Sequence, residues 1–264
     1  METSKTVLGP EHPDTLTIMT DLASSYRNQG RWVEAEKLDV QVMETSGTVL
    51  GPENPNMTSI ANLASTFWKG RWVEAENLEV QVMETRMTLL GPEHPDTLAS
   101  MANLASTFWN QGRWAEAEKL EVQVMETFKP VLGPEHPSTL TSMANLASTY
   151  RNQGRWVKAE KLFVQVMEAS KKVLGPKHPN TLASMANLVS THRNQGRWAE
   201  AEKLDVQVME TSMTVLGPEH PDTLTSMTNL ASTYRNQGRW VEAGKLVVQV
   251  METSKTVQIG RAHV

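Results

Sequence analysis

Five histidines recur at one place in a repeated segment, each directly before a proline, and they are the residues whose type could most readily do chemistry. They are His12, His94, His136, His178 and His220. Imidazole nitrogens bind zinc, but a metal site needs several ligands that converge within a few ångströms. Each histidine belongs to a different copy of the segment, and packed helices of neighbouring copies lie roughly 10 Å apart. The histidines therefore cannot share an ion, and we expect each one to mark the start of a helix.

No other arrangement of residues in the sequence supports catalysis. The phosphate-binding, dinucleotide-binding, zinc-protease and nucleophile-elbow motifs GxxxxGK[ST], GxGxxG, HExxH and GxSxG do not occur. Serine and threonine hydroxyls recur, but no histidine and carboxylate accompany them as a base and its orienting group. His192 stands where other copies have Tyr150 or Tyr234, which predicts a buried histidine with a satisfied partner. We predict a protein that is not an enzyme and holds no metal or cofactor.

Composition narrows the class of partner. The 264 residues carry a net charge of -5, with 25 basic and 30 acidic residues mixed along the chain, so no basic stripe is available for a nucleic acid backbone. The chain has no cysteine, which fits a reducing compartment. No apolar run approaches the roughly 20 residues that span a bilayer, and the opening METSKTV lacks the apolar stretch of a signal peptide. These features predict a cytoplasmic chain with no nucleic acid or membrane partner.

The tripeptide LGP recurs at a nearly constant period and defines six repeats, which we number in chain order. The spacings between successive copies are 42, 40, 42, 42 and 42 residues. The copies begin at Leu8, Leu50, Leu90, Leu132, Leu174 and Leu216. A constant period in this range indicates a stacked array. Because one unit is too small to bury its own apolar stripe, neighbouring units must stack and share their stability.

Each repeat contains two stretches with helical spacing of apolar residues. In repeat 4 the first stretch, helix A, starts near Pro137, which suits a first helical turn, and ends at Gly154, which can adopt a left-handed conformation. The second stretch, helix B, follows from Trp156. Gly47 and Pro130 lie in the last turn of a helix B and should fray or bend it. The pattern predicts an all-α fold, a right-handed α-solenoid of about six helix pairs with the A helices on its inner face.

The stretch NLASTYRNQGRWVKAE resembles the tetratricopeptide repeat in its 42-residue form, and its alternation with LGPEHPDTL resembles the kinesin light chain type. The resemblance covers residues 1–257. In repeat 4 the signature positions of the family fall on Met143, Leu146, Ala147, Tyr150, Gly154, Trp156 and Ala159. Similar arrays form the C-terminal sensing regions of fungal and bacterial NLR-like (NB-ARC/NACHT) proteins. The resemblance implies a protein-interaction module.

One position of helix B departs from the family, which usually has a large aromatic residue there. We call it the junction position; it is occupied by Asp39, Glu79, Glu121, Phe163, Asp205 and Val247. It lies within the apolar stripe, where an isolated carboxylate would cost several kcal/mol if fully buried. We expect each acid to be paired with an arginine, a tryptophan N–H or a hydroxyl between repeats. The alternative is a row of acids that binds cations, which Phe163 and Val247 interrupt.

The resemblance also implies that helix A faces a groove. One set of groove positions, the Asn column, consists of Asn62, Asn103, Asn145, Asn187 and Asn229, with Asp21 at the same position of repeat 1. Amide side chains donate and accept hydrogen bonds, so the Asn column could pair with the backbone of an extended peptide. A serine column lies beside it. A third set, the edge column, consists of Arg27, Trp68, Trp109, Arg151, Arg193 and Arg235.

Arginine and tryptophan often anchor interfaces, and arginine favours carboxylates. We therefore predict a groove for a protein or peptide partner of acidic or aromatic-acidic character. The alternative for the groove is that the asparagines cap or cross-link helices and the arginines are merely solvated. Two other functions stay open for the chain. It could be a self-associating array that stacks through its ends, or the sensing and oligomerising region of a larger NLR-like NTPase.

Both ends of the chain fall within a repeat. METSKTV at residues 1–7 and again at 251–257 corresponds to the middle of a helix B, so we expect the chain to be a fragment of a longer array. After residue 257 the register calls for leucine, but the sequence continues as QIGRAHV. IGRAHV is what one reading frame of a common sequencing-library adapter encodes. We predict that residues 258–264 are not native and are disordered or lack repeat packing.

Overall fold

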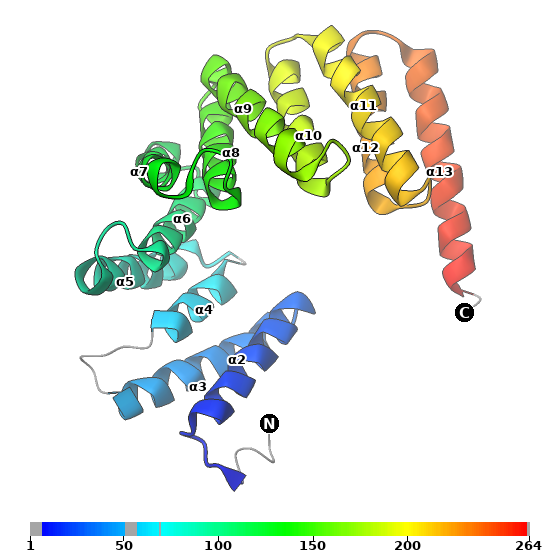
Figure 1. Ribbon diagram of the computed structural model, residues 1–264. Coiled ribbons are helices and arrows are strands. Elements are labelled where there is room, and N and C mark those ends of the chain that lie inside the picture. Colours follow the sequence, from blue (N-terminus) through cyan, green and yellow to red (C-terminus); the bar gives the residue numbers. More distant parts are fainter. Residues whose placement is uncertain (1–6, 51–56, 69, 263–264) are drawn as a thin grey trace. The chain divides into compact units, whose positions relative to one another are not determined.

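A computed structural model describes residues 7–50, 57–68 and 70–262, with side chains over 7–48, 57–68 and 70–255. The described residues form twelve α-helices and no strand, which confirms the all-α solenoid of six helix pairs (Figure 1). The helices are α2 (Pro13–Asn28), α3 (Trp32–Leu50), α4 (Met57–Phe67), α5 (Trp72–Leu90), α6 (Pro95–Asn110), α7 (Trp114–Leu132), α8 (Pro137–Asn152), α9 (Trp156–Leu174), α10 (Pro179–Asn194), α11 (Trp198–Leu216), α12 (Pro221–Asn236) and α13 (Trp240–Ala262). Their contacts divide the chain into two units, residues 1–127 and 128–264.

In the first unit, each helix packs against the helices before and after it in the sequence from α2 to α6. Its core includes a cluster of Met19, Ala23, Leu38 and Val42, which joins α2 to α3. A second cluster of Leu63, Phe67 and Ala75 joins α4 to α5. Since every cluster draws on two adjacent helices, the core is distributed along the unit, as expected for stacked repeats.

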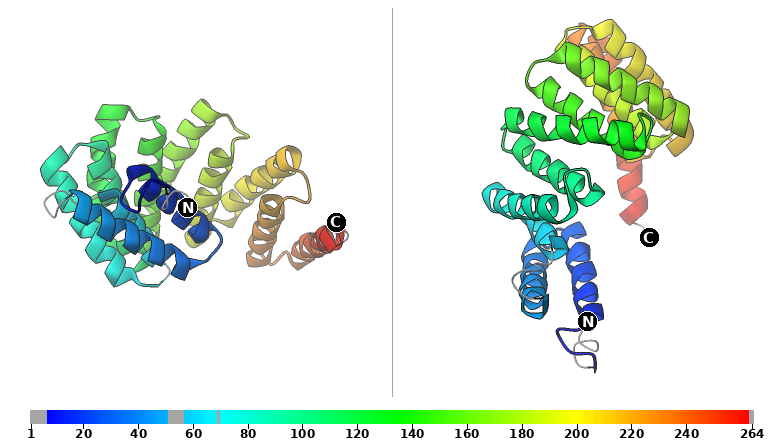
Figure 2. Two further views of the ribbon diagram at one scale, coloured as in Figure 1. Left: turned by 90° about the horizontal axis from the view of Figure 1, so that it is seen from below. Right: turned by 60° about the vertical axis from the view of Figure 1, so that its left-hand side comes forward.

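In the second unit, helices α8 to α13 follow the same pattern of neighbour-to-neighbour packing (Figure 2). Its main cluster consists of Ala147, Ala159, Phe163 and Leu188, so it takes residues from α8, α9 and α10. Helix A also touches the next helix A directly, in α8 with α10 and, within the first unit, in α2 with α4. The A helices therefore approach one another closely, which agrees with their predicted place on the inner side of each stack.

The recurrent histidines are the N-caps of the A helices. In α8, His136 has extended backbone angles, and its Nδ1 atom accepts a hydrogen bond of 3.2 Å from the backbone N–H of Ser138. His12, His94, His178 and His220 do the same for α2, α6, α10 and α12. The prediction that these residues mark helix starts is confirmed. Their chemical role is to satisfy a backbone donor that the first helical turn leaves without a partner.

A glycine ends each helix A by a conformation that other residues adopt at a cost. Gly154 has φ of 74°, and the following Arg155 N–H reaches back to the Tyr150 carbonyl at 2.8 Å. This geometry is a Schellman-type cap, which needs a left-handed residue.

The last turns of two B helices contain residues that were expected to fray or bend them. Gly47 lies within α3 and Pro130 within α7, and these helices continue past them to Leu50 and Leu132.

Helix α13 extends to Ala262, so the backbone of residues 258–262 is helical. The packing of the side chains from residue 256 onward, and residues 263–264, lie outside the described residues. The non-native origin of residues 258–264 stays a prediction.

Within each unit, the arginine of the GRW motif between helices A and B links a repeat to the one before it. Arg197 donates to Glu160 at 2.7 Å, and Gln195 donates to the same carboxylate at 2.8 Å. Arg239 and Gln237 bind Glu202 in the same way. In five of the repeats the motif arginine also donates to the glutamate three residues on, as Arg197 does to Glu200. These contacts are partly exposed, so each one is individually weak.

Candidate functional site

The amide side chains of the Asn column are partly exposed on α4, α6, α8, α10 and α12. None of these amides forms a hydrogen bond with another side chain or with the backbone among the described residues. Asn110 and Asn236 differ, because each donates to a carbonyl of its own helix. The alternative that the Asn column caps or cross-links neighbouring helices is therefore not what the structure shows. The amides have donors and acceptors to spare for a ligand.

In the serine column beside it, which consists of Ser24, Ser65, Ser106, Ser148, Ser190 and Ser232, four hydroxyls are hydrogen-bonded within their own helices. Ser65, Ser106, Ser148 and Ser190 each donate to the carbonyl four residues earlier, at 2.9 to 3.1 Å. Such bonds hold the hydroxyl against its own helix. These four serines thus leave room on the face without offering a free donor, and the amides of the Asn column are the polar groups that remain available there.

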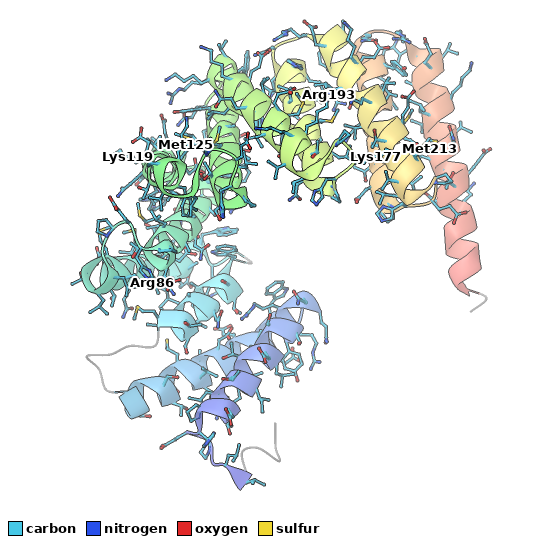
Figure 3. All side chains as sticks on the ribbon, in the orientation of Figure 1. Arg86, Lys119, Met125, Lys177, Arg193 and Met213 are labelled. Carbon is cyan, nitrogen blue, oxygen red and sulfur yellow. The ribbon has the colours of Figure 1, made fainter. Side chains whose placement is uncertain are left out.

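In repeat 5 the edge residue, Arg193, and the junction residue, Asp205, are joined by a hydrogen bond. Arg193 lies on α10 (Figure 3). Its Nη2 lies 2.7 Å from a carboxylate oxygen of Asp205 on α11. The same guanidinium donates to the Asn229 carbonyl and the Thr233 hydroxyl on α12, at 2.7 and 2.8 Å. Thr233 in turn donates to Asp205 at 2.5 Å. Arg193 therefore joins three helices, and its side chain is only 18% exposed.

Repeat 1 repeats this arrangement in the first unit. Arg27 lies 2.6 Å from Asp39 and also donates to Thr66 in the next helix A. In repeat 2 the pair changes to Trp68 and Glu79, joined by a hydrogen bond of 2.9 Å from the indole N–H. The expectation that the junction acids are paired is confirmed for Asp39, Glu79 and Asp205. Asp39 and Asp205 each accept a hydrogen bond from a threonine of the next repeat, whereas Glu79 is bound by Trp68 of its own repeat. Trp109 Nε1 is buried and has no hydrogen-bond partner among the described residues.

Burial changes the pKa of two acids at the junction position, Asp205 and Glu79. It raises the pKa of the Asp205 carboxyl, while the hydrogen bond from Thr233 and the charge of Arg193 oppose the shift. Burial likewise raises the pKa of the Glu79 carboxyl. Both groups are almost inaccessible to solvent, so removing water from the ionised form is the larger effect.

Repeat 4 differs because Phe163 replaces the acid. Its ring is fully buried, and the Arg151 guanidinium lies over it with 5.6 Å between the guanidinium carbon and the ring centroid. No hydrogen bond or ion pair joins Arg151 to any described residue. Burial lowers the pKa of the Arg151 guanidinium, which is the effect of removing water without supplying an anion. Arg235, which lies opposite Val247 in the sequence pattern, is exposed.

His192 is buried as predicted, with 6% of its surface exposed, but its partner is incomplete. Its Nδ1 atom accepts no hydrogen bond and lies 3.9 Å from the Glu160 carboxylate. Burial lowers the pKa of the imidazole, the charge of Arg197 adds to this effect, and Glu160 opposes it. The predicted burial is confirmed, but Nδ1 lacks the hydrogen bond that a fully satisfied histidine would have.

Other parts of the described chain offer little as alternative sites. A cavity of ≈ 510 Å³ lies at the turn end of the second unit, against Trp156, Glu160 and Arg197, and another of ≈ 530 Å³ lies against Met143, Glu168 and Lys172. Neither includes a member of the Asn column. The described histidines and acids nowhere gather in a group of three that could hold a metal ion. Within the same residues, every helix is too short or too polar to cross a membrane.

Family models named tetratricopeptide repeat match nearly the whole array. One matches residues 56–129, 103–168, 144–193 and 184–255, and another matches residues 15–56. The chain belongs to the tetratricopeptide repeat (TPR) family. Among curated proteins, none is similar enough in sequence to the TPR chain to count as a match.

Solved structures support the same family. A Podospora anserina protein described as a kinesin light chain with nearly identical TPR-like repeats is 33% identical, with a TM-score of 0.71 over 79% of this chain and 98% of that one. A variant of the same protein is 34% identical, with a TM-score of 0.71 over 76% of this chain and 96% of that one. BtubC from P. vanneervenii shares the fold at 17% identity, with a TM-score of 0.68 over 92% of both chains.

The repeat pattern predicts the edge column and the junction position separately, but their contact with each other was not predicted. In five of the six TPR units the edge residue lies twelve positions before the junction residue, as Arg193 does before Asp205. The two positions change together, and this covariation between repeats was the available signal. Arginine accompanies aspartate in repeats 1 and 5, and tryptophan accompanies glutamate in repeats 2 and 3.

Proposed function

We propose that the TPR chain is a non-enzymatic scaffold whose A-helix face binds an extended peptide of a partner protein. The observation that carries this proposal is the Asn column, in which five partly exposed amides have no partner among the described residues. Each amide of the Asn column could form two or more hydrogen bonds, and the amides occupy one position of successive A helices. An extended peptide offers N–H and C=O groups at regular intervals, so it is the partner whose backbone such amides would pair with.

The chemistry of the peptide follows from the edge column. Arg151 and Arg235 are arginines without an acidic partner among the described residues, and Trp68 and Trp109 are partly exposed aromatic residues. Arginine binds carboxylates and aromatic residues pack on apolar side chains, which favours a peptide of acidic or aromatic-acidic character.

The test starts from a random peptide library displayed against the full chain, and the selected peptide is then used as the probe. Replacing Asn145 and Asn187 together by alanine should lower its affinity by about tenfold or more, because each lost amide removes about 1 kcal/mol of hydrogen bonding. The matched control is Gln165→Ala with Gln207→Ala, which removes two exposed amides from the B helices at the same spacing. Equal affinity of the asparagine variant and the control, with unchanged helicity, would overturn the groove assignment.

Self-association is a second candidate because α13 exposes apolar side chains. Val248 and Met251 are each 54% exposed, and Val247 is 40% exposed where Asp205 is buried on α11. A surface of this kind could pack on another copy of the array. Light scattering over a wide range of concentration should show growth in mass that Val248→Lys abolishes, and a constant monomer mass would exclude this function.

A further inference from the structure

Arg151 and Arg193 occupy the same position of successive A helices, but only one of them has partners. Arg193 contacts Asp205, Asn229 and Thr233. Arg151 has the ring of Phe163 on one face and forms no hydrogen bond or ion pair with the described residues. The two guanidinium groups can form the same number of hydrogen bonds, but among the described residues only that of Arg193 forms any.

The difference comes from the junction position and from the next helix A. Phe163 packs in the cluster of Ala147, Ala159 and Leu188, so the space that Asp205 fills with a carboxylate is filled with carbon in repeat 4. On the following helix, Thr191 donates to its own Asn187 carbonyl at 2.9 Å. The equivalent Thr233 donates to Asp205 instead. None of the three equivalent residues, Phe163, Asn187 and Thr191, forms a hydrogen bond with Arg151.

A half-buried guanidinium without an anion is poised to bind one. It has lost part of its hydration, it retains up to five N–H donors, and its planar fork matches a carboxylate. Arginines of the edge column already bind carboxylates in this fold, at 2.6 Å in repeat 1 and 2.7 Å in repeat 5. Arg235 also lacks an acid at the junction position, but it is exposed and keeps its water.

We propose that Arg151 binds a carboxylate of the peptide ligand, which supplies to Arg151 the anion that Asp205 supplies to Arg193. The inference rests on the proposed function, because it places the ligand along α8, where Asn145 and Ser148 precede Arg151 on the partly exposed stripe. The residue at the junction position then acts as the determinant of specificity. An acid there commits the arginine to the fold, and an apolar residue there leaves it for the ligand.

The carboxylate could be an acidic side chain or a C-terminus, and small probes separate the two. We would titrate the full chain with N-acetylglutamate α-amide and with N-acetylglycine while recording the Nε–H signals of arginine by NMR, and Arg151→Gln would identify the Arg151 signal. A saturable shift of the Arg151 signal, with that of Arg193 unmoved, is expected for the source that binds. Shifts of Arg151 no larger than those of exposed Arg235 with both probes would overturn the proposal.

A reciprocal exchange tests the role of the junction position. The probe is a fluorescein-labelled peptide amide, Gly-Ser-Glu-Ser-Glu-Ser-Glu-Gly, with its Gln-for-Glu analogue as the reference. We expect the chain to prefer the Glu peptide by about tenfold, which one charge-assisted pair can supply. Phe163→Asp should abolish the preference by giving Arg151 an internal partner, and Asp205→Phe should increase it by releasing Arg193.

Because Phe163→Asp alters the core, Arg151→Gln serves as the second variant, since it removes the guanidinium and leaves the cluster intact. Loss of the preference in Arg151→Gln supports the proposal, and an unchanged preference overturns it. Failure of the proposed function is recognised separately. In that case the asparagine variants do not affect the selected peptide, while the NMR shift of Arg151 still reports its carboxylate site.

Discussion

Repeats 4 and 5 have the same length, the same helix bounds relative to their LGP tripeptides and the same arginine at the edge of helix A. In repeat 5 that arginine is bound to Asp205 and to two groups of α12. In repeat 4 it faces the ring of Phe163. One residue at the junction position therefore changes an arginine from a structural cross-link into an available cation, while the backbone stays the same.

The other repeats extend the lesson. The edge residue and the junction residue vary as a pair. In three repeats the edge residue donates a hydrogen bond to the acid at the junction position, as Arg27 does to Asp39, Trp68 to Glu79 and Arg193 to Asp205. The six pairs are Arg27 and Asp39, Trp68 and Glu79, Trp109 and Glu121, Arg151 and Phe163, Arg193 and Asp205, and Arg235 and Val247. A buried acid without a donor would be costly, so a change at one position favours a change at the other.

The largest expected effect on stability comes from removing the Phe163 ring in repeat 4. Phe163→Ala should lower the free energy of unfolding by about 4 kcal/mol, because the ring is fully buried and its loss leaves a cavity. Urea unfolding followed by circular dichroism measures the change, and hydrogen exchange shows whether it is confined to α8–α10. The neighbouring Val164→Ala, at a 37% exposed site, should cost less than about 1 kcal/mol. A loss below about 1 kcal/mol in Phe163→Ala would mean that the cluster does not hold repeat 4 together.

Breaking the polar side should cost somewhat less. Asp205→Ala leaves Arg193 without its anion, and removing one partner of a buried pair typically costs about 3 kcal/mol. Asp205→Phe copies repeat 4 and should recover most of this loss, since apolar replacement of a buried ion pair is often neutral. Exposed Glu210→Ala is the control on the same helix. If Asp205→Phe is as unstable as Asp205→Ala in urea unfolding, the two arrangements are not interchangeable.

A smaller difference between repeats 4 and 5 should appear in the pH dependence of stability, because repeat 5 has His192 where repeat 4 has Tyr150. Because burial lowers the pKa of His192 in the folded state, the unfolded chain binds its proton more readily. The free energy of unfolding should therefore fall as the pH drops through the ordinary histidine value of about 6.5. His192→Tyr, which copies Tyr150 of repeat 4, should lessen this loss. Urea unfolding at several pH values between neutral and mildly acidic gives the comparison, and the N-cap histidines affect both proteins equally. Parallel pH profiles would show that His192 contributes no pH dependence.

Much of the fold was predictable because its causes are local. Pro137 and Gly154 bound a helix through their own backbone preferences, and the apolar spacing between them defines the face that packs. The role of His136 as an N-cap was only partly predictable, since the hydrogen bond to Ser138 depends on the ring orientation. Of the candidate site, the positions of the Asn column were predictable from the repeat, but its lack of partners among the described residues was not.

By itself, therefore, the sequence determined the period, the twelve described helices, their caps and the columns of equivalent residues, because each follows from contacts within one repeat. Only the tertiary structure decided which arginine is committed. Arg193 meets Thr233 from 40 positions away, and Arg151 meets no equivalent group among the described residues. The physical reason is that a buried charge needs partners on neighbouring helices, and only the packing of those helices shows which groups come within hydrogen-bonding distance.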